Sequence, residues 1–380
     1  MARSRAHSPY PERWPNRPRG VALIASLTVL AIAVVAATAM SYQVHLNTRR
    51  SQNVIAQEQA WQYAVGAEAA AIAILERDRA SNDIDYQAST TEEELWFTPI
   101  AITRKLPGNA QLSFAIADLQ GRLNLNAVAG EKQEPEQGGR RAPNPEAGKA
   151  ARAQFARLLS QQGVPTSAKR LENALADWID ADRRSRFPGG AEDDFYTTQD
   201  PPHRAGNTRL VDPSALRRIK GFRSDEAAER WNAICPYVTT LPRDVDRINV
   251  NTASIPVLAS LASELDTEAA EQAVNLRDSE PYESVDDFLQ RNPAFNAVDL
   301  DTSRLTVSSQ YFMVHARVTR SRARVDVYSI VHRPAAGDSG EAEPAKIIYR
   351  STVAPRRMGT TSDDDDEEDT TPCIGQRLTF

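Results

Sequence analysis

Six carboxylates lie close together in the segment DWIDADRRSRFPGGAEDDFY, which runs from residue 177 to residue 196. Asp177 and Asp180 are three residues apart, so on a helix they would share one face, and Asp182 follows where that helix is expected to end. The turn-forming residues 187–190 can bring a second acidic group back beside the first. Because carboxylates at such distances repel one another unless a cation joins them, the segment predicts a cation site.

Calcium is the cation that this set of donors favours. The ligands are hard oxygen atoms with no histidine nearby, which argues against zinc, and a flexible loop suits calcium better than magnesium. The opposing interpretation is a solvated acidic surface whose charge Arg183, Arg184 and Arg186 neutralise in part. We expect four direct ligands, Asp180, Asp182, Glu192 and Asp193, with Asp177 and Asp194 serving a second ion or the outer shell.

Paired carboxylates can also act as the acid and base of an enzyme, so an exported metal-dependent hydrolase is one alternative. The five histidines of the chain are scattered, and the sequence contains neither a G-x-S-x-G nor an H-E-x-x-H motif. Two acids on a loop do not form an active site without a cleft and a nucleophile. We therefore expect no catalytic activity.

The elements that position these residues begin with an apolar N-terminal segment. Residues 21–40 carry no charge, and about 20 residues at about 1.5 Å each span the roughly 30 Å of a bilayer's hydrocarbon core. Five arginines and one glutamate precede the segment, which predicts that residues 1–20 stay in the cytoplasm. Residues 41–79 contain no proline, and apolar residues recur there at helical spacing, so a long amphipathic helix should follow. These apolar residues are Val54, Trp61, Val65 and Ile72.

Three interpretations of this N-terminus compete. A secretory signal peptide would be cleaved after Ala39, but the apolar run is longer than the usual signal-peptide core. A plain membrane anchor explains the length but gives no role to Gly20, the residue that ends the basic stretch. The third interpretation is processing between Gly20 and Val21.

Alternating and helical patterns divide the rest of the chain. In Leu112–Val128 apolar residues alternate on both sides of Gln120-Gly121, which predicts a β-hairpin. Alternation returns in three runs between residues 311 and 354, whereas helical patterns dominate residues 150–300. We therefore expect an α+β fold, in which strands distant in sequence close an antiparallel sheet and a large α-helical domain is inserted between them.

Charge and cysteine content narrow the class of protein. The formal net charge is -6 at pH 7, so a general nucleic-acid binder is not expected. Cys235 and Cys373 are the only cysteines, which excludes a cysteine-based zinc cluster. They can form one disulfide in an oxidising compartment or remain two separate thiols. The acidic run Asp363–Asp369 lacks apolar periodicity and is expected to be a solvated tail.

A basic leader that ends in glycine, an uncharged helical span and a continuing amphipathic stem together resemble the N-terminus of a type IV pilin or pseudopilin. The resemblance implies that a prepilin peptidase cleaves between Gly20 and Val21 and methylates the new amine. Most members of that family have glutamate at the fifth mature position, where this chain has Ala25. That glutamate pairs with a neighbouring subunit, and a carboxylate without such a partner would be costly in lipid. Its absence points to a tip subunit and to the minor pseudopilin K family of the type II secretion system.

Other segments resemble the same family. DLQGRLNLN, residues 118–126, is close to the segment that opens the pseudopilin K sheet, and DWIDAD and GGAED match the segment associated with bound calcium. The resemblance implies a single-pass inner-membrane protein with a cytoplasmic N-terminus and a periplasmic remainder. It would join minor pseudopilins of the I, J and H types in the tip complex that starts and caps the pseudopilus. The partners would bind through the apolar stem face that includes Val54, Trp61 and Val65.

Residues 248–289 resemble the helix-hairpin-helix element of DNA-uptake and repair proteins, so a membrane-anchored DNA-binding protein is the second alternative. Glycines of that hairpin offer backbone N–H groups to phosphate, but here residues 263–268 include three acids, which oppose DNA binding. Ser284 fits the N-cap of a helix that starts at Val285. Residues 210–222, with Arg217, Arg218 and Lys220, resemble a second copy of this SAM-like unit.

The expected organisation has seven parts. They are a leader at 1–20, the membrane-spanning and amphipathic helix at 21–79, the first part of the sheet at 80–129, a linker at 130–149, the inserted helical domain at 150–303, the last part of the sheet at 304–355 and an acidic tail at 356–380.

Overall fold

The structure is a computed structural model that describes most of the chain. The expected leader with Gly20, residues 130–147 of the linker and the acidic run Asp363–Asp369 lie outside the described residues. For residues 101–105 and 227–228 it describes the backbone alone. The described ranges are 21–81, 84–86, 96–97, 100–129, 148–164, 168–222, 227–335, 343–353 and residue 373.

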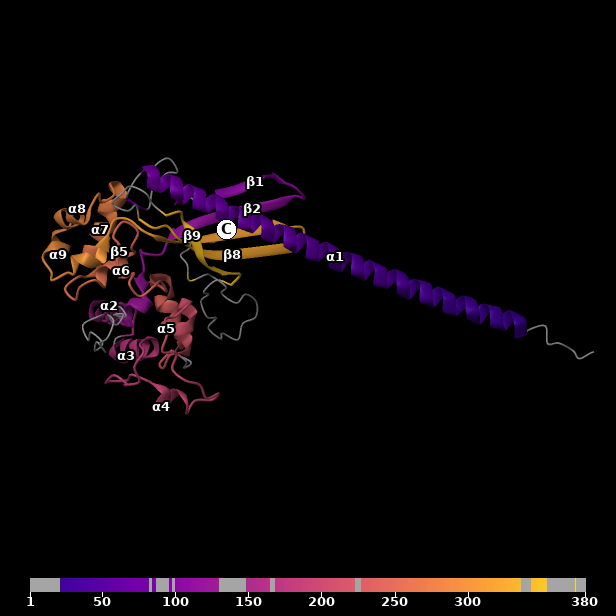
Figure 1. Ribbon diagram of the computed structural model, residues 1–380, viewed down its shortest axis with the longest axis horizontal. Coiled ribbons are helices and arrows are strands. Elements are labelled where there is room, and N and C mark those ends of the chain that lie inside the picture. Colours follow the sequence, from indigo (N-terminus) through magenta and orange to yellow (C-terminus); the bar gives the residue numbers. More distant parts are fainter. Residues whose placement is uncertain are drawn as a thin grey trace, which may run out of the picture. The chain divides into compact units, whose positions relative to one another are not determined.

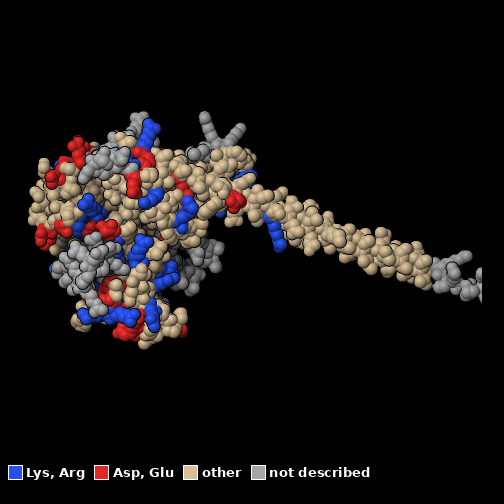
Figure 2. Space-filling model, in the orientation of Figure 1, with Lys and Arg blue, Asp and Glu red and all other residues tan. Residues whose placement is uncertain are grey.

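Helix α1 runs without a break over Val21–Ser81 (Figure 1). Lys, Arg, Asp and Glu are absent between Val21 and Thr48, and the apolar side chains there are exposed, so this stretch has the length and composition of a membrane span. In Figure 2 the N-terminal part of α1 accordingly presents an uncharged surface. The expectation of an apolar segment continuing into a long helix is confirmed. The chain forms two compact units, residues 1–58 and residues 59–380.

The second unit contains a five-stranded antiparallel sheet with strand order β1-β2-β7-β8-β9. Neighbouring strands β2 and β7 are adjacent in space although the whole helical region lies between them in sequence, as expected for an inserted block. The three runs of alternation after residue 311 are β7, β8 and β9. The strands are β1 Ile100–Leu106, β2 Ala110–Asp118, β7 Tyr311–Arg320, β8 Ala323–His332 and β9 Lys346–Ser351.

The part of α1 within this unit packs on the sheet through a stripe of small residues. Alanine side chains let the helix backbone approach the strands closely, where they meet Phe114, Val314 and Val327. The buried face of α1 is therefore not centred on the apolar residues that the sequence suggested. Trp61 and Ile72 are only half-buried at the margin of the same core. The buried stripe consists of Ala60, Ala64, Ala67, Ala71 and Leu75.

The predicted hairpin centred on Gln120-Gly121 is wrong. Residues 123–124 form β3, which pairs in parallel with β4, Val238–Thr239, and not with β2. Residues 123–128 are all buried, so their apolar pattern reflects the core of the helical region. Gly121 lets the backbone lie close to Thr252, because a Cβ at this position would be 2.7 Å from the hydroxyl of Thr252.

The hairpin instead joins β2 to β1 through residues 107–109. Gly108 and Asn109 adopt positive φ in its turn. No strand was predicted from the pattern of residues 100–106, which form strand β1.

The helical region contains two hydrophobic cores. One surrounds α2, α3 and α5, and the other surrounds α6, α7, α8 and α9, next to the short parallel pair β5, Ile248–Asn249, and β6, Leu305–Thr306. The helices are α2 Lys149–Gln161, α3 Ala168–Ile179, α4 Asp193–Tyr196, α5 Ala227–Ile234, α6 Ile255–Ala259, α7 Thr267–Ser279, α8 Val285–Arg291 and α9 Pro293–Asn296. Single-turn 3-10 helices are η1 Leu125–Ala129, η2 Pro213–Arg218, η3 Cys235–Tyr237 and η4 Thr302–Arg304.

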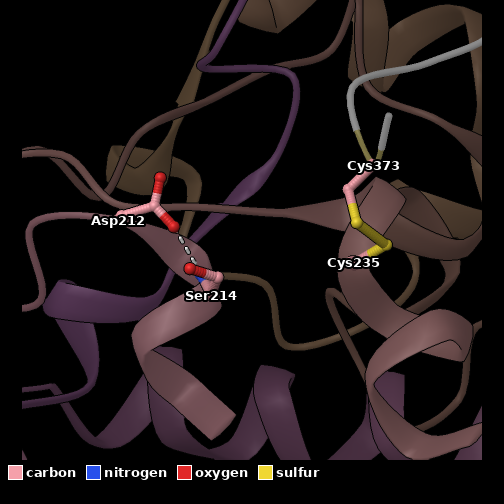
Figure 3. Close-up of a disulfide and its surroundings, with 4 residues drawn as sticks. All are labelled: Asp212, Ser214, Cys235 and Cys373. Atoms are coloured by element: carbon pink, nitrogen blue, oxygen red, sulfur yellow. Dashed lines mark hydrogen bonds between the residues drawn. A yellow bond between two sulfur atoms is a disulfide. The ribbon is translucent and has the colours of Figure 1, made fainter. Parts of the chain in front are cut away.

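The two cysteines, whose pairing the sequence left open, form a disulfide (Figure 3). Cys235 starts η3 and Cys373 is the one described residue beyond Val353. Their Cα atoms are 5.2 Å apart, within the usual range for a disulfide, and both residues belong to the core around α2 and α3. Beside them in Figure 3, Asp212 accepts a hydrogen bond from the backbone N of Ser214 at 2.8 Å and so caps η2.

Candidate metal centre

The acidic segment folds back on itself between α3 and α4. Asp177 lies in the last turn of α3, and Glu192 immediately precedes α4. Gly189 has φ +83°, and a Cβ on Gly190 would lie 2.2 Å from Oδ2 of Asp177, so the turn needs glycine at both positions. This turn returns the second acidic group to the first, as the sequence predicted.

Three carboxylates converge at the base of this turn. One oxygen from each of Asp180, Asp182 and Glu192 lies within 4.8 Å of the others, a spacing that could hold a metal ion. Asp180 and Glu192 are buried, whereas Asp182 is exposed. Oδ1 of Asp180 and both carboxylate oxygens of Glu192 are buried without a hydrogen-bond partner among the described residues. Since buried unsatisfied acceptors are costly, the three carboxylates fit a cation.

The pKa shifts of Glu192 and Asp180 also favour a bound cation. Burial, together with the charges of Asp177 and Asp180, raises the pKa of Glu192 to about 8. Burial also raises the pKa of Asp180, although its hydrogen bond to Arg186 opposes the shift. A divalent cation between these oxygens would favour their ionised forms and remove the repulsion between them.

The structure places the other three predicted residues differently. Asp177 is fully buried, and its Oδ1 lies 2.6 Å from Nη1 of Arg186. Oδ1 of Asp193 accepts a hydrogen bond from the backbone N of Ala205 at 3.0 Å, and Asp194 is exposed. Asp177, Asp193 and Asp194 therefore do not belong to the convergent group of three carboxylates.

Sequence reasoning missed the role of Arg186. The sequence analysis considered that all three loop arginines could neutralise part of the acidic charge and did not single out Arg186. In the structure Arg183 and Arg184 are exposed, whereas Arg186 pairs with both Asp177 and Asp180. One available signal was its position directly before the turn, where the backbone reverses toward α3.

In the segment that resembles a helix-hairpin-helix, polar side chains cap the starts of α7 and α8. The side chain of Asp266 accepts a hydrogen bond from the backbone N of Ala269 at 2.9 Å and caps α7, at the place where a DNA binder would offer N–H groups to phosphate. Ser284 caps α8 by accepting from the backbone N of Asp287 at 3.0 Å, as predicted. Buried Arg277 donates to the carbonyl of Val250, so it serves packing.

A long N-terminal helix that is apolar at its start and packs further along on an antiparallel sheet defines a pilin-like protein with an added helical region. Family models described as type II secretion system, protein K match residues 121–243 and residues 248–308. The protein K of Pseudomonas aeruginosa is 33% identical over 83% of this chain and 88% of its own length. That of Klebsiella pneumoniae is 31% identical over 84% of this chain and 93% of its own. The chain belongs to the type II secretion system protein K family.

A solved structure supports the fold. The crystal structure of the GspK-GspI-GspJ complex from enterotoxigenic Escherichia coli contains a chain that matches 80% of this one with a TM-score of 0.63. The match covers 99% of that chain at 24% identity, so it is evidence for the fold alone.

Family membership confirms two predictions and is consistent with a third. The chain is a minor pseudopilin of the type II secretion system, as its resemblance to pseudopilin K implied. Members of this family are not enzymes, so the carboxylates between α3 and α4 are not a catalytic pair. The apolar start of α1 is consistent with a membrane-anchored pseudopilin.

Proposed function

We propose that this chain is the tip subunit of the pseudopilus, the subunit with no neighbour above it. The observation that carries the proposal is Ala25, an uncharged residue in an apolar helix where most pilins place a glutamate for the next subunit. A carboxylate at that depth without a partner would be costly, so a tip subunit is better without one. The tip complex would start and cap the fibre that exports folded proteins.

The nearest partners in this proposal are minor pseudopilins of the I and J types, with the H type below them. The crystallised Escherichia coli GspK in its complex with GspI and GspJ supports this assignment. Val54 is 66% exposed and is free for such a contact, whereas Trp61 already packs against the sheet of its own chain. The partner-binding stripe therefore belongs to the N-terminal part of α1, where the apolar side chains are exposed.

Processing and topology complete the proposal. A prepilin peptidase would cleave between Gly20 and Val21, leaving the apolar start of α1 in the inner membrane and the rest of the chain in the periplasm. Residues 150–303 would form one inserted domain with SAM-like units, in which α6 and α7 take the place of the helix-hairpin-helix. Its hairpin acids and the Asp266 cap support a structural role there and no role in binding DNA.

A calcium ion would serve this domain structurally. Asp180, Asp182 and Glu192 would hold it, which would fix the turn between α3 and α4 and satisfy the buried oxygens of Asp180 and Glu192. Asp193 and Asp194 would contribute at most through the outer shell, since Asp193 already accepts the backbone N of Ala205.

Co-purification tests the proposal. The detergent-solubilised full chain should form a stable complex with the I- and J-type pseudopilins of the same system, and its mature N-terminal residue should be Val21. Replacing Val54 by Lys should weaken the complex. Replacing Val353 by Lys should not, although Val353 is similarly exposed and lies in the other unit. A mature N-terminus at Met40 would indicate a signal peptide and would contradict the proposal.

A further inference from the structure

The acidic cluster between α3 and α4 has two halves that differ in how their charge is balanced. In the first half, Oδ1 of Asp177 accepts a hydrogen bond from Nη1 of Arg186 at 2.6 Å, and Oδ2 accepts from the backbone N of Arg186 at 3.0 Å. Nη1 of Arg186 also donates to Oδ2 of Asp180. One guanidinium group therefore bridges the carboxylates of Asp177 and Asp180.

In the second half, no described side chain donates a hydrogen bond to the carboxylate oxygens. Arg243 lies near enough to interact with the charge of Asp180, but its guanidinium donates to the carbonyl of Ile179. Oδ1 of Asp180 and both oxygens of Glu192 are buried without a partner, and Glu192 is only 2% exposed. Asp182 lies with them, and its Oδ1 accepts a hydrogen bond from the backbone N of Arg184. Asp180 thus belongs to both halves, with one oxygen facing the guanidinium and the other facing the unpartnered carboxylates.

The fold holds Arg186 in this place. Its carbonyl accepts a hydrogen bond from the backbone N of Gly190 at 2.9 Å, and a Cβ on Gly190 would collide with that carbonyl and with Oδ2 of Asp177. The side chain of Asp177 is completely inaccessible, so its charge depends on the guanidinium for compensation. Arg183 and Arg184, in contrast, point into solvent.

The formal charge of the cluster indicates how many divalent ions it can balance. Asp177, Asp180, Asp182 and Glu192 carry four negative charges when ionised, and Arg186 offsets one of them. A single divalent ion would then bring the cluster close to neutrality. Without the guanidinium, two divalent ions would be needed to balance the four negative charges of the same carboxylates.

We propose that Arg186 is a built-in cation of this centre: its guanidinium takes the place of one metal ion between Asp177 and Asp180, and the cluster binds a single divalent ion at Asp180, Asp182 and Glu192. The inference rests on the proposed function, because it presupposes that the cluster binds metal. Arg186 does not touch the ion. It acts by orienting Asp180, so that the other carboxylate oxygen of Asp180 faces the ion.

Ion counting tests the inference. The full chain in detergent is dialysed to equilibrium against calcium chloride, and the bound calcium is measured by mass spectrometry. The expected result is one ion per chain for the natural sequence and two for Arg186→Ala, since Asp177 and Asp180 would then need a cation. The double variant Arg186→Ala with Asp177→Asn should return to one ion, and the control Arg184→Ala should bind one.

Each outcome decides a different claim. Two ions in the natural sequence, or one ion in Arg186→Ala at unchanged affinity, would overturn the role of Arg186 and leave calcium binding intact. No bound calcium in the natural sequence would overturn the metal site of the proposed function itself. Should Arg186→Ala fail to fold, as judged by circular dichroism, Arg186→Gln keeps a hydrogen-bonding group without the charge and should also bind two ions.

Discussion

Arg350 in the edge strand β9 donates two hydrogen bonds to the carboxylate of Glu68 in α1, from Nε to Oε1 at 2.8 Å and from Nη2 to Oε2 at 2.6 Å. Glu68 is 1% exposed and also accepts a hydrogen bond from the hydroxyl of Ser329 in β8. Because a buried carboxylate without a partner is costly, this paired charge favours the observed register of α1 on the sheet.

Removing Arg350 should therefore destabilise the chain. Arg350→Ala leaves the buried carboxylate of Glu68 with Ser329 as its remaining partner among the described residues. The expected loss in the free energy of unfolding is about 2 kcal/mol. The measurement is the urea midpoint of the full chain in detergent. Lys346→Ala is the control in the same strand, since Lys346 and Glu343 form an exposed pair that should contribute less than about 1 kcal/mol. Equal losses in both variants would argue against a special role for Glu68.

A second buried acidic group joins the end of α1 to the sheet and the helical region. Nη2 of Arg333 lies 2.6 Å from Oδ1 of Asp85, and its Nη1 lies 2.8 Å from Oδ2 of Asp78. Oδ2 of Asp118 accepts hydrogen bonds from the hydroxyl of Ser309 at 2.7 Å and the side-chain amide of Asn249 at 3.2 Å. Burial raises the pKa of Asp118 to about 6 and that of Asp85 to about 6.

These shifts predict how stability depends on pH. A carboxyl group whose pKa is higher in the folded than in the unfolded chain binds protons preferentially when folded, between about pH 4 and pH 6. The contribution of such a group to the free energy of unfolding therefore increases as the pH falls from 7 to 5. For Asp118 the increase is about 1 kcal/mol. Urea midpoints should show that the natural sequence gains this amount relative to Asp118→Asn over that interval. Parallel pH profiles for the two proteins would rule the shift out.

Calcium should raise the melting temperature of the full chain, because an ion that binds only the folded state stabilises it by mass action. At a calcium concentration of about 100 times Kd the gain is about 2.7 kcal/mol. Asp182→Ala together with Glu192→Ala should abolish the shift, and the control Asp194→Ala should retain it, since Asp194 is exposed outside the convergent group. A shift that survives the double substitution would place the ion elsewhere.

The disulfide should stabilise the folded chain. Cys235 and Cys373 are 138 residues apart in sequence, and closing so long a loop restricts the unfolded chain. Replacing both cysteines by serine should lower the free energy of unfolding by about 3 kcal/mol. Addition of a reductant to the natural sequence should reproduce the loss and leave the serine variant unchanged. No difference between the two proteins would contradict a stabilising role.

Local patterns predicted much of this fold. The uncharged run and the absence of proline sufficed for α1, and partial alternation of apolar residues sufficed for β7, β8 and β9. Strand pairing could not be inferred in the same way. The alternating apolar residues of 123–128 are buried in the core of the helical region, and their pattern only resembles the second arm of a hairpin. Strand β1 was missed because its residues lie in a polar stretch without a clear alternating signal.

The sequence was enough to predict which acidic residues form the cluster between α3 and α4, but not which of them pair with Arg186 and which remain unpartnered. The spacing of the acids and the glycine turn were enough to predict that Asp180, Asp182 and Glu192 could meet. Whether a given carboxylate faces a cation, a backbone N–H or an arginine depends on the loop path, which the sequence does not encode locally. For this reason the sequence did not reveal that Asp193 accepts a hydrogen bond from the backbone N of Ala205, or that Asp177 accepts one from the guanidinium of Arg186.

The position of this chain in the fibre is the central claim, and labelling assembled pseudopili tests it most directly. Pseudopili are sheared from cells that make the complete secretion system and are stained with gold-conjugated antibody against residues 150–303. A tip subunit should carry gold at one end of each fibre. Gold distributed along the length of the fibres would contradict the account.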